Sequence, residues 1–111
     1  MGVATNGTIL RAGALEIRPE EFVVRAAGRP LRLTVRELQL LTALAQRSGR
    51  IVSREELYTE VWGEPFRKSD RSVDVYVGKL RHKLEDALPA SSFIHTHFGF
   101  GYRFTPERKA P

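Results

Sequence analysis

The first third of the chain alternates apolar and polar residues in short runs that end at glycine or proline. The alternating runs are 8–11, 15–17, 22–25 and 29–33, and the turn residues between them include Gly13, Pro19 and Gly28. Short alternating runs at regular spacing are typical of strands with one buried and one solvated face. The pattern therefore predicts a small antiparallel sheet at the N-terminal end.

After position 33 the apolar residues recur at helical spacing, which predicts a helix. Thr34 and Glu37 have the spacing of a capping box, in which each side chain accepts a hydrogen bond from the other residue's backbone N–H. The apolar stripe that follows consists of Leu38, Leu41, Leu44 and Ala45. The Ser48-Gly49 pair ends the helix, and residues 50–52 form a short extended link.

A second helix is predicted from the same signature at Ser53 and Glu56. Leu57 and Val61 point inward at helical spacing, and the helix closes near Trp62-Gly63. Pro65 bars its continuation because proline has no N–H to donate.

The third predicted helix starts near Ser69-Asp70 and has one apolar face. Its stripe consists of Val73, Val77, Leu80 and Leu84, and its opposite face of Arg71, Val75, Gly78 and His82. This pattern predicts a helix that packs on a core and leaves its other face free.

Two short runs at the C-terminal end, 93–97 and 102–104, flank the Gly99-Phe100-Gly101 turn and predict a β-hairpin. Strands, three helices and a hairpin make an α+β domain. Two capped helices before a basic third helix suit a winged helix-turn-helix, with the hairpin as the wing.

The composition limits the chain to one domain. Its 111 residues suffice for an N-terminal segment 1–13, a folded domain 14–104 and a loose polar tail 105–111. Cysteine is absent, so disulfides and thiolate metal sites are excluded. No apolar run is long enough to cross a membrane, and residues 1–7 lack the apolar block of a signal peptide. We therefore expect a cytoplasmic protein.

No arrangement of residues suits catalysis. The sequence has no nucleophile–base pair, glycine-rich phosphate loop or metal constellation, so we expect neither an enzyme nor a bound cofactor. His95 and His97 share a strand face, but with His82 elsewhere and no cysteine a closed metal site lacks ligands. We expect both histidines on a solvated wing, with one of them available to a phosphate.

Positive charge is concentrated in one segment. The chain has 18 Lys and Arg against 13 Asp and Glu, a net charge of +5. Residues 53–66 carry one basic and four acidic side chains, whereas residues 67–83 carry six basic and two acidic ones. A basic helical segment favours a nucleic-acid partner.

Four motifs follow one another along residues 14–104. They are Leu33-Thr34-x-x-Glu37-x-x-Leu40-Leu41, Gly49-Arg50-Ile51-Val52-Ser53-Arg54-Glu55-Glu56-Leu57 with Val61-Trp62-Gly63, Asp70-Arg71-Ser72-Val73-Asp74-Val75-Tyr76-Val77-x-x-Leu80-Arg81-x-Lys83-Leu84, and Gly99-x-Gly101-Tyr102-Arg103-Phe104. Together they resemble the OmpR/PhoB-type effector domain of bacterial two-component response regulators. The resemblance implies a third helix in the major groove of double-stranded DNA, a hairpin along the minor groove, and a Trp62–Ser69 loop that faces RNA polymerase.

The resemblance also implies a set of DNA-contacting residues on three elements. They are Arg54 and Trp62 on the second helix, Arg71, Ser72, Tyr76, Lys79 and Arg81 on the third, and Thr96, His97, Phe98 and Tyr102 on the hairpin. Guanidinium and ammonium groups match guanine edges and phosphate oxygens, which is the chemistry that such contacts need.

A plainer interpretation stands beside this one. The basic residues of the third helix would then form a solvated face paired with Asp70, Asp74 and Glu85. Tyr76 either bonds DNA through its hydroxyl or flanks the core, and Trp62 can pack in the core and reach the backbone at once. Arg54 either meets a phosphate at the start of a capped helix or lies on the surface beside Glu55 and Glu56.

Two positions depart from the family's pattern. The family's wing has Thr-Val-Arg-Gly where this chain has Thr96-His97-Phe98-Gly99, so Phe98 replaces the arginine that probes the minor groove. Gly78 removes a side chain from the free face of the third helix. We expect Phe104 in the core, with Phe100 as a second candidate for it. Phe98 is expected either exposed, as an apolar wedge, or packed on its own hairpin.

Two functions remain. The first is sequence-specific DNA binding for transcriptional control by the effector domain of a response regulator, with monomers pairing head-to-tail on tandem half-sites. The second is a protein-interaction module that docks through the acidic second helix and the Trp62–Ser69 loop. Only the first predicts a steep dependence of log K on log salt with duplex DNA.

Overall fold

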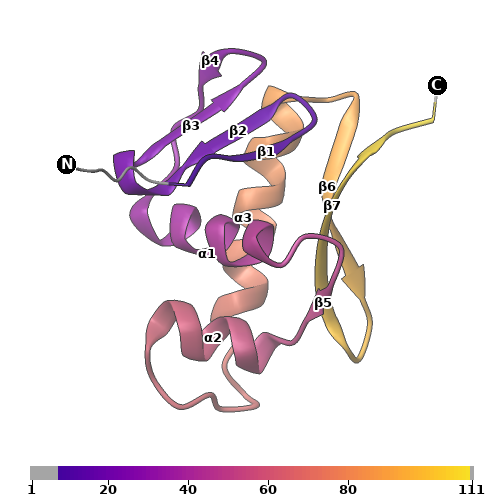
Figure 1. Cartoon of the computed structure of the whole chain (residues 1–111). Helices are drawn as coiled ribbons and strands as arrows, with labels where there is room; N and C mark the ends of the chain where they lie inside the picture. The colour runs from indigo at the N-terminus through magenta and orange to yellow at the C-terminus, as the bar shows by residue number, and fades with distance from the viewer. Residues whose placement is uncertain (1–7, 111) are drawn as a thin grey trace.

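The computed structural model describes residues 8–110 and has the expected α+β architecture (Figure 1). Its elements are β1 (Leu10–Ala12), β2 (Leu15–Arg18), the 3-10 turn η1 (Pro19–Glu21), β3 (Val23–Ala26), β4 (Arg29–Pro30), α1 (Val35–Gln46), β5 (Ile51–Val52), α2 (Arg54–Trp62), α3 (Ser72–Ala87), β6 (Ser91–His97) and β7 (Gly101–Arg108). The absence of a signal peptide was predicted from residues 1–7, which lie outside the described part. The winged helix-turn-helix prediction is confirmed by the order of sheet, helices and hairpin.

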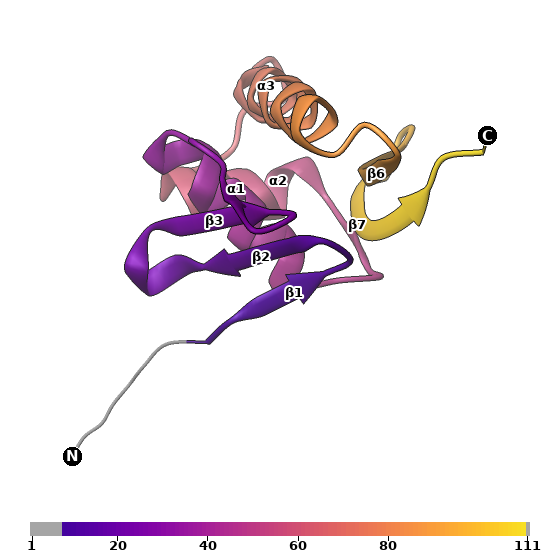
Figure 2. The ribbon, with the colours of Figure 1, turned by 90° about the horizontal axis from the view of Figure 1, so that it is seen from above.

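The strands form two antiparallel sheets. The N-terminal sheet has the order β1-β2-β3-β4, and the second has the order β5-β7-β6. Seen from above, α1 lies between the N-terminal sheet and α3 (Figure 2). Because β1 pairs with β2, the predicted boundary at residue 14 falls inside a hairpin, and the sheet begins at Leu10.

The fourth predicted strand, 29–33, is wrong beyond its first two residues. Only Arg29 and Pro30 pair with β3, and the Leu31 N–H makes one more bond to the Val24 carbonyl at 2.8 Å. Leu31 and Leu33 remain half-buried between exposed neighbours, so the alternation is real. The chain leaves the sheet edge there to enter α1.

The capping box at the start of α1 is confirmed. The Thr34 hydroxyl accepts from the Glu37 N–H at 3.1 Å, and the Glu37 carboxylate accepts from the Thr34 N–H at 2.8 Å. The predicted stripe is buried, and α1 packs against α2, α3 and β7. The hydrophobic cluster around α1 is thus the core on which the other helices rest.

Only half of the second capping box forms. The Ser53 hydroxyl accepts from the Glu56 N–H at 3.0 Å, but the Glu56 carboxylate pairs with Arg50 at 2.9 Å and Arg47 at 3.4 Å. Nearby guanidinium groups are stronger partners for a carboxylate than a backbone amide. The helix ends as predicted at Gly63, whose φ of 72° gives a left-handed cap.

Helix α3 begins at Ser72 and not at Ser69-Asp70. Asp70 stands before the helix, where its carboxylate accepts from the Ser72 N–H at 2.8 Å. The predicted stripe is confirmed, because all four of its residues are buried: Val73, Val77, Leu80 and Leu84. The face that carries Val75 and Gly78 is exposed.

The C-terminal hairpin is longer than predicted. Strand β7 continues to Arg108, and its last residues pair with the start of β6 at Ser91 and Ser92. The interpretation of residues 105–108 as a loose tail is therefore wrong. Residues 105–108 are polar because this end of β7 is largely exposed to solvent. Without alternating apolar residues, no strand could be predicted there from the sequence. In the described part of the chain, no helix combines the length and the apolar character needed to span a bilayer.

Candidate nucleic-acid interface

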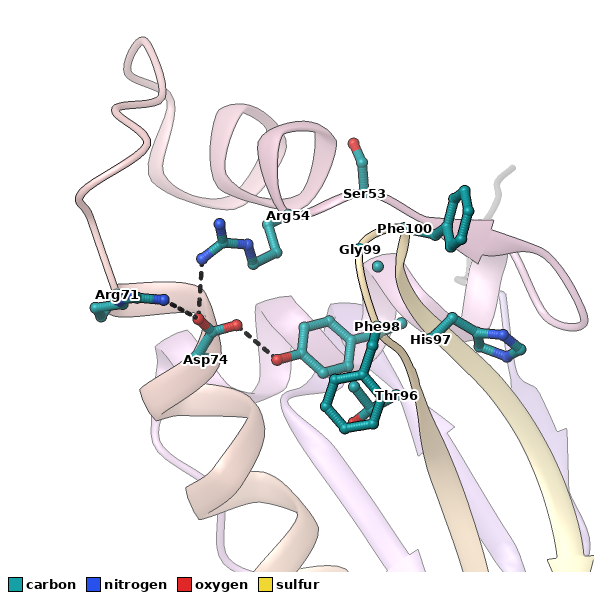
Figure 3. A pocket seen from close by; sticks show the side chains of 11 residues that line it. Ser53, Arg54, Arg71, Asp74, Thr96, His97, Phe98, Gly99 and Phe100 are labelled. Atoms are coloured by element: carbon teal, nitrogen blue, oxygen red, sulfur yellow. Dashed lines mark hydrogen bonds and ion pairs between the residues drawn. The ribbon is translucent and has the colours of Figure 1, made fainter.

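The starts of α2 and α3 and the tip of the wing enclose a concavity of about 520 Å³ (Figure 3). Ser53 and Arg54 line it from α2, and Arg71 and Asp74 from the start of α3. The wing contributes residues 96–102. Three segments that are distant in sequence therefore meet at one surface.

The wing lies against the start of α2 because of Gly101. Its φ of 143° and the absence of a side chain let β7 approach the β5 backbone, where a Cβ would collide with the Val52 carbonyl. Val52 pairs with Tyr102 in the same ladder. The wing is thus fixed to the residue that precedes the N-cap of α2.

Asp74 is the centre of the polar contacts in the concavity. Its carboxylate accepts from the Tyr102 hydroxyl at 2.6 Å and from Arg54 Nη1 at 2.9 Å, and Arg71 Nη1 lies at 3.7 Å (Figure 3). Burial of the Tyr102 ring and the neighbouring Asp74 carboxylate raise the pKa of the phenol to about 12. Tyr102 therefore stays protonated at neutral pH and acts as a donor.

The concavity carries a surplus of positive charge. Arg54 and Arg71 face one carboxylate, Asp74, which is the only acidic residue among the described residues that line this surface. Arg54 also stacks over Phe66, with the guanidinium carbon 5.6 Å from the ring centroid. An oxyanion can bind here by replacing the Asp74 carboxylate as the partner of Arg54 or Arg71.

The outer face of α3 has two further predicted residues. Lys79 is exposed, and its ammonium lies 5.0 Å from the Tyr76 ring. Tyr76 is half-buried and packs its edge on Trp62 at 5.5 Å. Trp62 in turn stacks on Tyr58 at 5.2 Å, which places both predicted aromatic contacts at the border between the core and the surface.

Arg81 and Thr96, two predicted DNA contacts, bond each other. Arg81 Nη2 donates to the Thr96 hydroxyl at 2.9 Å, and its Nε donates to the Ile94 carbonyl at 3.2 Å. These bonds tie α3 to β6. Ser72, also predicted, uses its backbone N–H on Asp70 at the start of α3.

The wing histidines are held by their own hairpin and are not freely solvated as predicted. Arg103 Nε donates to His97 Nε2 at 3.0 Å, and His95 Nε2 lies 2.8 Å from the Thr105 carbonyl. Both bonds connect β6 with its partner strand. The histidines therefore stiffen the wing.

The tip of the wing exposes two phenyl rings. Phe98 is 88% exposed and Phe100 is 73% exposed, whereas Phe104 is buried. The exposure of Phe98 is confirmed, its packing against the hairpin is contradicted, and the placement of Phe100 in the core is wrong. The strand alternation starts only at Gly101, because a turn closed by the Phe100 N–H and the His97 carbonyl at 2.9 Å comes before it.

Asp74 organises this surface, but from the sequence it was predicted only as a counter-charge to the basic residues of α3. Its i,i+3 spacing from Arg71 was a visible signal. The other two partners lie 20 and 28 residues away, so sequence spacing carried no information about them.

The family described as "Transcriptional regulatory protein, C terminal" matches residues 28–104. The transcriptional regulatory protein CseB of Streptomyces coelicolor is 37% identical over 92% of this chain, and AfsQ1 of the same organism is 38% identical over 85%. The chain spans 42% of the length of each of these two relatives.

Solved structures with the same fold include two DNA-binding domains. That of CpxR from E. coli superposes with a TM-score of 0.81 at 34% identity, covering 89% of this chain and 97% of that one. The RstA domain of Klebsiella pneumoniae, solved in complex with the RstA box, gives 0.80 at 32% identity and covers 88% and 97%.

Proposed function

The chain belongs to the family of C-terminal domains of transcriptional regulatory proteins, and we propose that it binds double-stranded DNA sequence-specifically, as the effector domain of a two-component response regulator. Its family is one of transcription regulators and not a class of enzymes. The observation that carries the proposal is the juxtaposition of the Arg54–Arg71 concavity with the free, basic face of α3. Binding, and not catalysis, is the activity that we assign to it.

Helix α3 is suited to the major groove. Its 16 residues span about 24 Å, and a groove about 12 Å wide admits one helix. Arg71 and Lys79 project from its exposed side, and the exposed Val75 between them offers an apolar contact to a thymine methyl group. At Gly78 nothing projects, so the bases beside it are read less closely.

Phosphates would bind on either side of that helix. Arg54 lies in the first turn of α2, where free backbone amides and the helix dipole add to its charge. Arg81, Thr96, His97 and Tyr102 already bond within the protein, so a role for them requires a shared or exchanged hydrogen bond. We assign the principal direct contacts to the exposed Arg71 and Lys79, and to Arg54, whose bond to the partly exposed Asp74 would have to be exchanged for a phosphate.

The Trp62–Ser69 loop is the proposed contact with RNA polymerase. Phe66 anchors it by packing edge-on against Tyr58 at 5.6 Å, which leaves Arg67 and Lys68 exposed. A loop fixed in this way can present charged side chains without a large entropic cost. Charge reversal at Arg67 and Lys68 should abolish activated transcription without changing duplex affinity.

Head-to-tail binding on tandem half-sites completes the proposal, with a cytoplasmic monomer as the free form. We expect a single species of monomer mass in sedimentation and two adjacent protections in the same orientation in footprints. Protection of palindromes alone, or a tight dimer at low concentration, would contradict this part.

The proposal is tested by selecting duplexes from a random pool and measuring their affinity in a salt series. We expect one enriched sequence, and a log K that falls steeply with log salt. The double variant R71A/K79A should lose this binding, whereas R29A/R32A removes two exposed arginines from the N-terminal end and should retain it. A protein-interaction module would give no enrichment and a shallow slope.

A further inference from the structure

We propose that the wing tip, Phe98-Gly99-Phe100, is an apolar wedge that enters the minor groove beside the major-groove site and partly unstacks one base step. This inference rests on the proposed DNA binding. It adds a mode of recognition that acts through deformation of the duplex.

The Phe98 and Phe100 rings contribute little to the packing of the domain, because both are largely exposed. The strand ladder stops at the His97–Gly101 pair, so Phe98 and Phe100 belong to the turn and not to the sheet. The two other short hairpin turns, between β1 and β2 and between β3 and β4, carry only Gly13-Ala14 and Ala27-Gly28. Two large apolar side chains together at a solvated turn are characteristic of a contact surface.

The tip has a rigid base, which a wedge needs. Gly101 holds β7 against the Val52 carbonyl, and the Arg81–Thr96 bond ties β6 to α3. The bond between Arg103 and His97 joins the two strands just below the turn. The rings are therefore carried at a fixed position relative to the recognition helix, and little freedom is lost when they bind.

The charge beside the tip favours DNA as the occupant. Arg54 and Arg71 line the same concavity as Phe98 and Phe100, so a polyanion is attracted to this place. If α3 lies in the major groove, the phosphate strand that borders the groove passes through the concavity. The wing tip, which lines the concavity opposite Arg54 and Arg71, then faces the adjacent minor groove.

An apolar tip selects a different sequence feature from a cationic one. A cation is drawn to the narrow, strongly negative groove of an A-tract, which is stiff. Phenyl rings gain by insertion at a flexible pyrimidine–purine step, such as TA or CA, that unstacks at low cost. Phe98 and Phe100 leave the turn in different directions, so one ring can insert while the other covers the sugar edge (Figure 3).

The test uses the selected duplex with 2-aminopurine placed in turn at each position of the flank, because its fluorescence rises when it unstacks. With the wild-type chain we expect a rise of about twofold or more at one step, and tighter binding when that step is TA than when it lies in an A-tract. F98A/F100A should lose the rise and bind about tenfold more weakly. F22A removes another exposed phenyl, in the turn between η1 and β3, and should change neither quantity.

A second variant distinguishes insertion between bases from a general gain in affinity. F98R adds a cation to the tip, so it should bind more tightly, most of all beside A·T-rich flanks, with a reduced fluorescence rise. Unchanged fluorescence at every position in a tight wild-type complex would overturn the wedge and leave the proposed function intact. If F98A/F100A lost only self-association or polymerase binding, the tip would be a protein contact and the wedge would be rejected. Absence of any duplex binding would instead refute the proposed function.

Discussion

Two carboxylates of this domain, Glu37 on α1 and Asp74 on α3, each bind a cation from another element, but their surroundings differ. The Glu37 side chain is 3% exposed and accepts from Lys83 Nζ at 2.7 Å as well as from the backbone of Thr34. The Asp74 side chain is 31% exposed and faces the concavity. The pair of Glu37 with Lys83 therefore stabilises the fold, whereas the partners of Asp74 can be exchanged.

Burial decides which role each pair has. A carboxylate out of contact with water loses much when its partner is removed, whereas one at the surface is resolvated. At Asp74 a phosphate can replace the carboxylate as the partner of an arginine, because both are oxyanions. The Glu37 carboxylate is buried, so a phosphate from solution cannot take its place as the partner of Lys83.

Loss of the buried Glu37–Lys83 pair should have the strongest effect on stability. Breaking a fully buried pair costs about 3–5 kcal/mol, but Lys83 is 37% exposed and can reach water. We expect Glu37→Ala to lower the free energy of unfolding by about 2 kcal/mol, since the capping box is lost as well. Urea unfolding measures this, with the exposed Glu64→Gln as a control that should stay within about 0.5 kcal/mol of wild type.

Arg71→Ala should have an effect of similar size, but on DNA binding and not on folding. Arg71 is exposed at the start of α3, so we expect the selected duplex to be bound about 1–3 kcal/mol more weakly, with relaxed preference at one base pair. Affinities for a set of single-base variants of the site measure this. An equal loss on all of them would show that Arg71 contacts phosphate only.

Asp74→Asn removes the competing charge and should affect DNA binding in the opposite direction. We expect stronger binding to unrelated duplexes and a salt slope larger in magnitude by about 1, because Arg54 and Arg71 become free for phosphates. Asp86→Asn, at the exposed far end of α3, is the matched control. Equal slopes in the two variants would show that Asp74 does not compete with DNA.

Arg54→Ala should give a uniform loss across sequences and a salt slope smaller in magnitude by about 1. Its position in the first turn of α2, beside the concavity, is the reason. The measurement is the same salt series, on the selected and an unrelated duplex. An unchanged slope would remove Arg54 from the phosphate contacts.

The smallest effect concerns acid. Burial of the Glu37 carboxyl raises its pKa, but hydrogen bonds from Lys83 and Thr34 lower it by more, and the net pKa lies below the ordinary 4.5. The stabilisation is therefore present above pH 4.5 and is lost as the pH falls below it. Urea midpoints at pH 7 and pH 3.5 should fall less for Glu37→Gln than for wild type. An identical fall would assign the acid sensitivity to other carboxyls.

The two carboxylates also differ in how much of their surroundings could be predicted from the sequence. The Thr34–Glu37 box and the α3 stripe were predictable because their partners lie within four residues along one helix. The Lys83 contact to Glu37, 46 residues away, and the Tyr102 contact to Asp74 depend on how helices pack and were not predictable. Phe100 was misplaced because the alternation of the strand was extended through a turn.

We infer that the Asp74 cluster exchanges its partners on DNA, whereas the Glu37 pair does not. The direct measurement is an NMR titration of the chain with its selected duplex, following the guanidinium signals of Arg54 and Arg71 and the Nζ signal of Lys83. We expect both arginine signals to shift and Lys83 to stay unchanged. Unmoved arginine signals in a saturated complex, or a shifted Lys83, would contradict the claim.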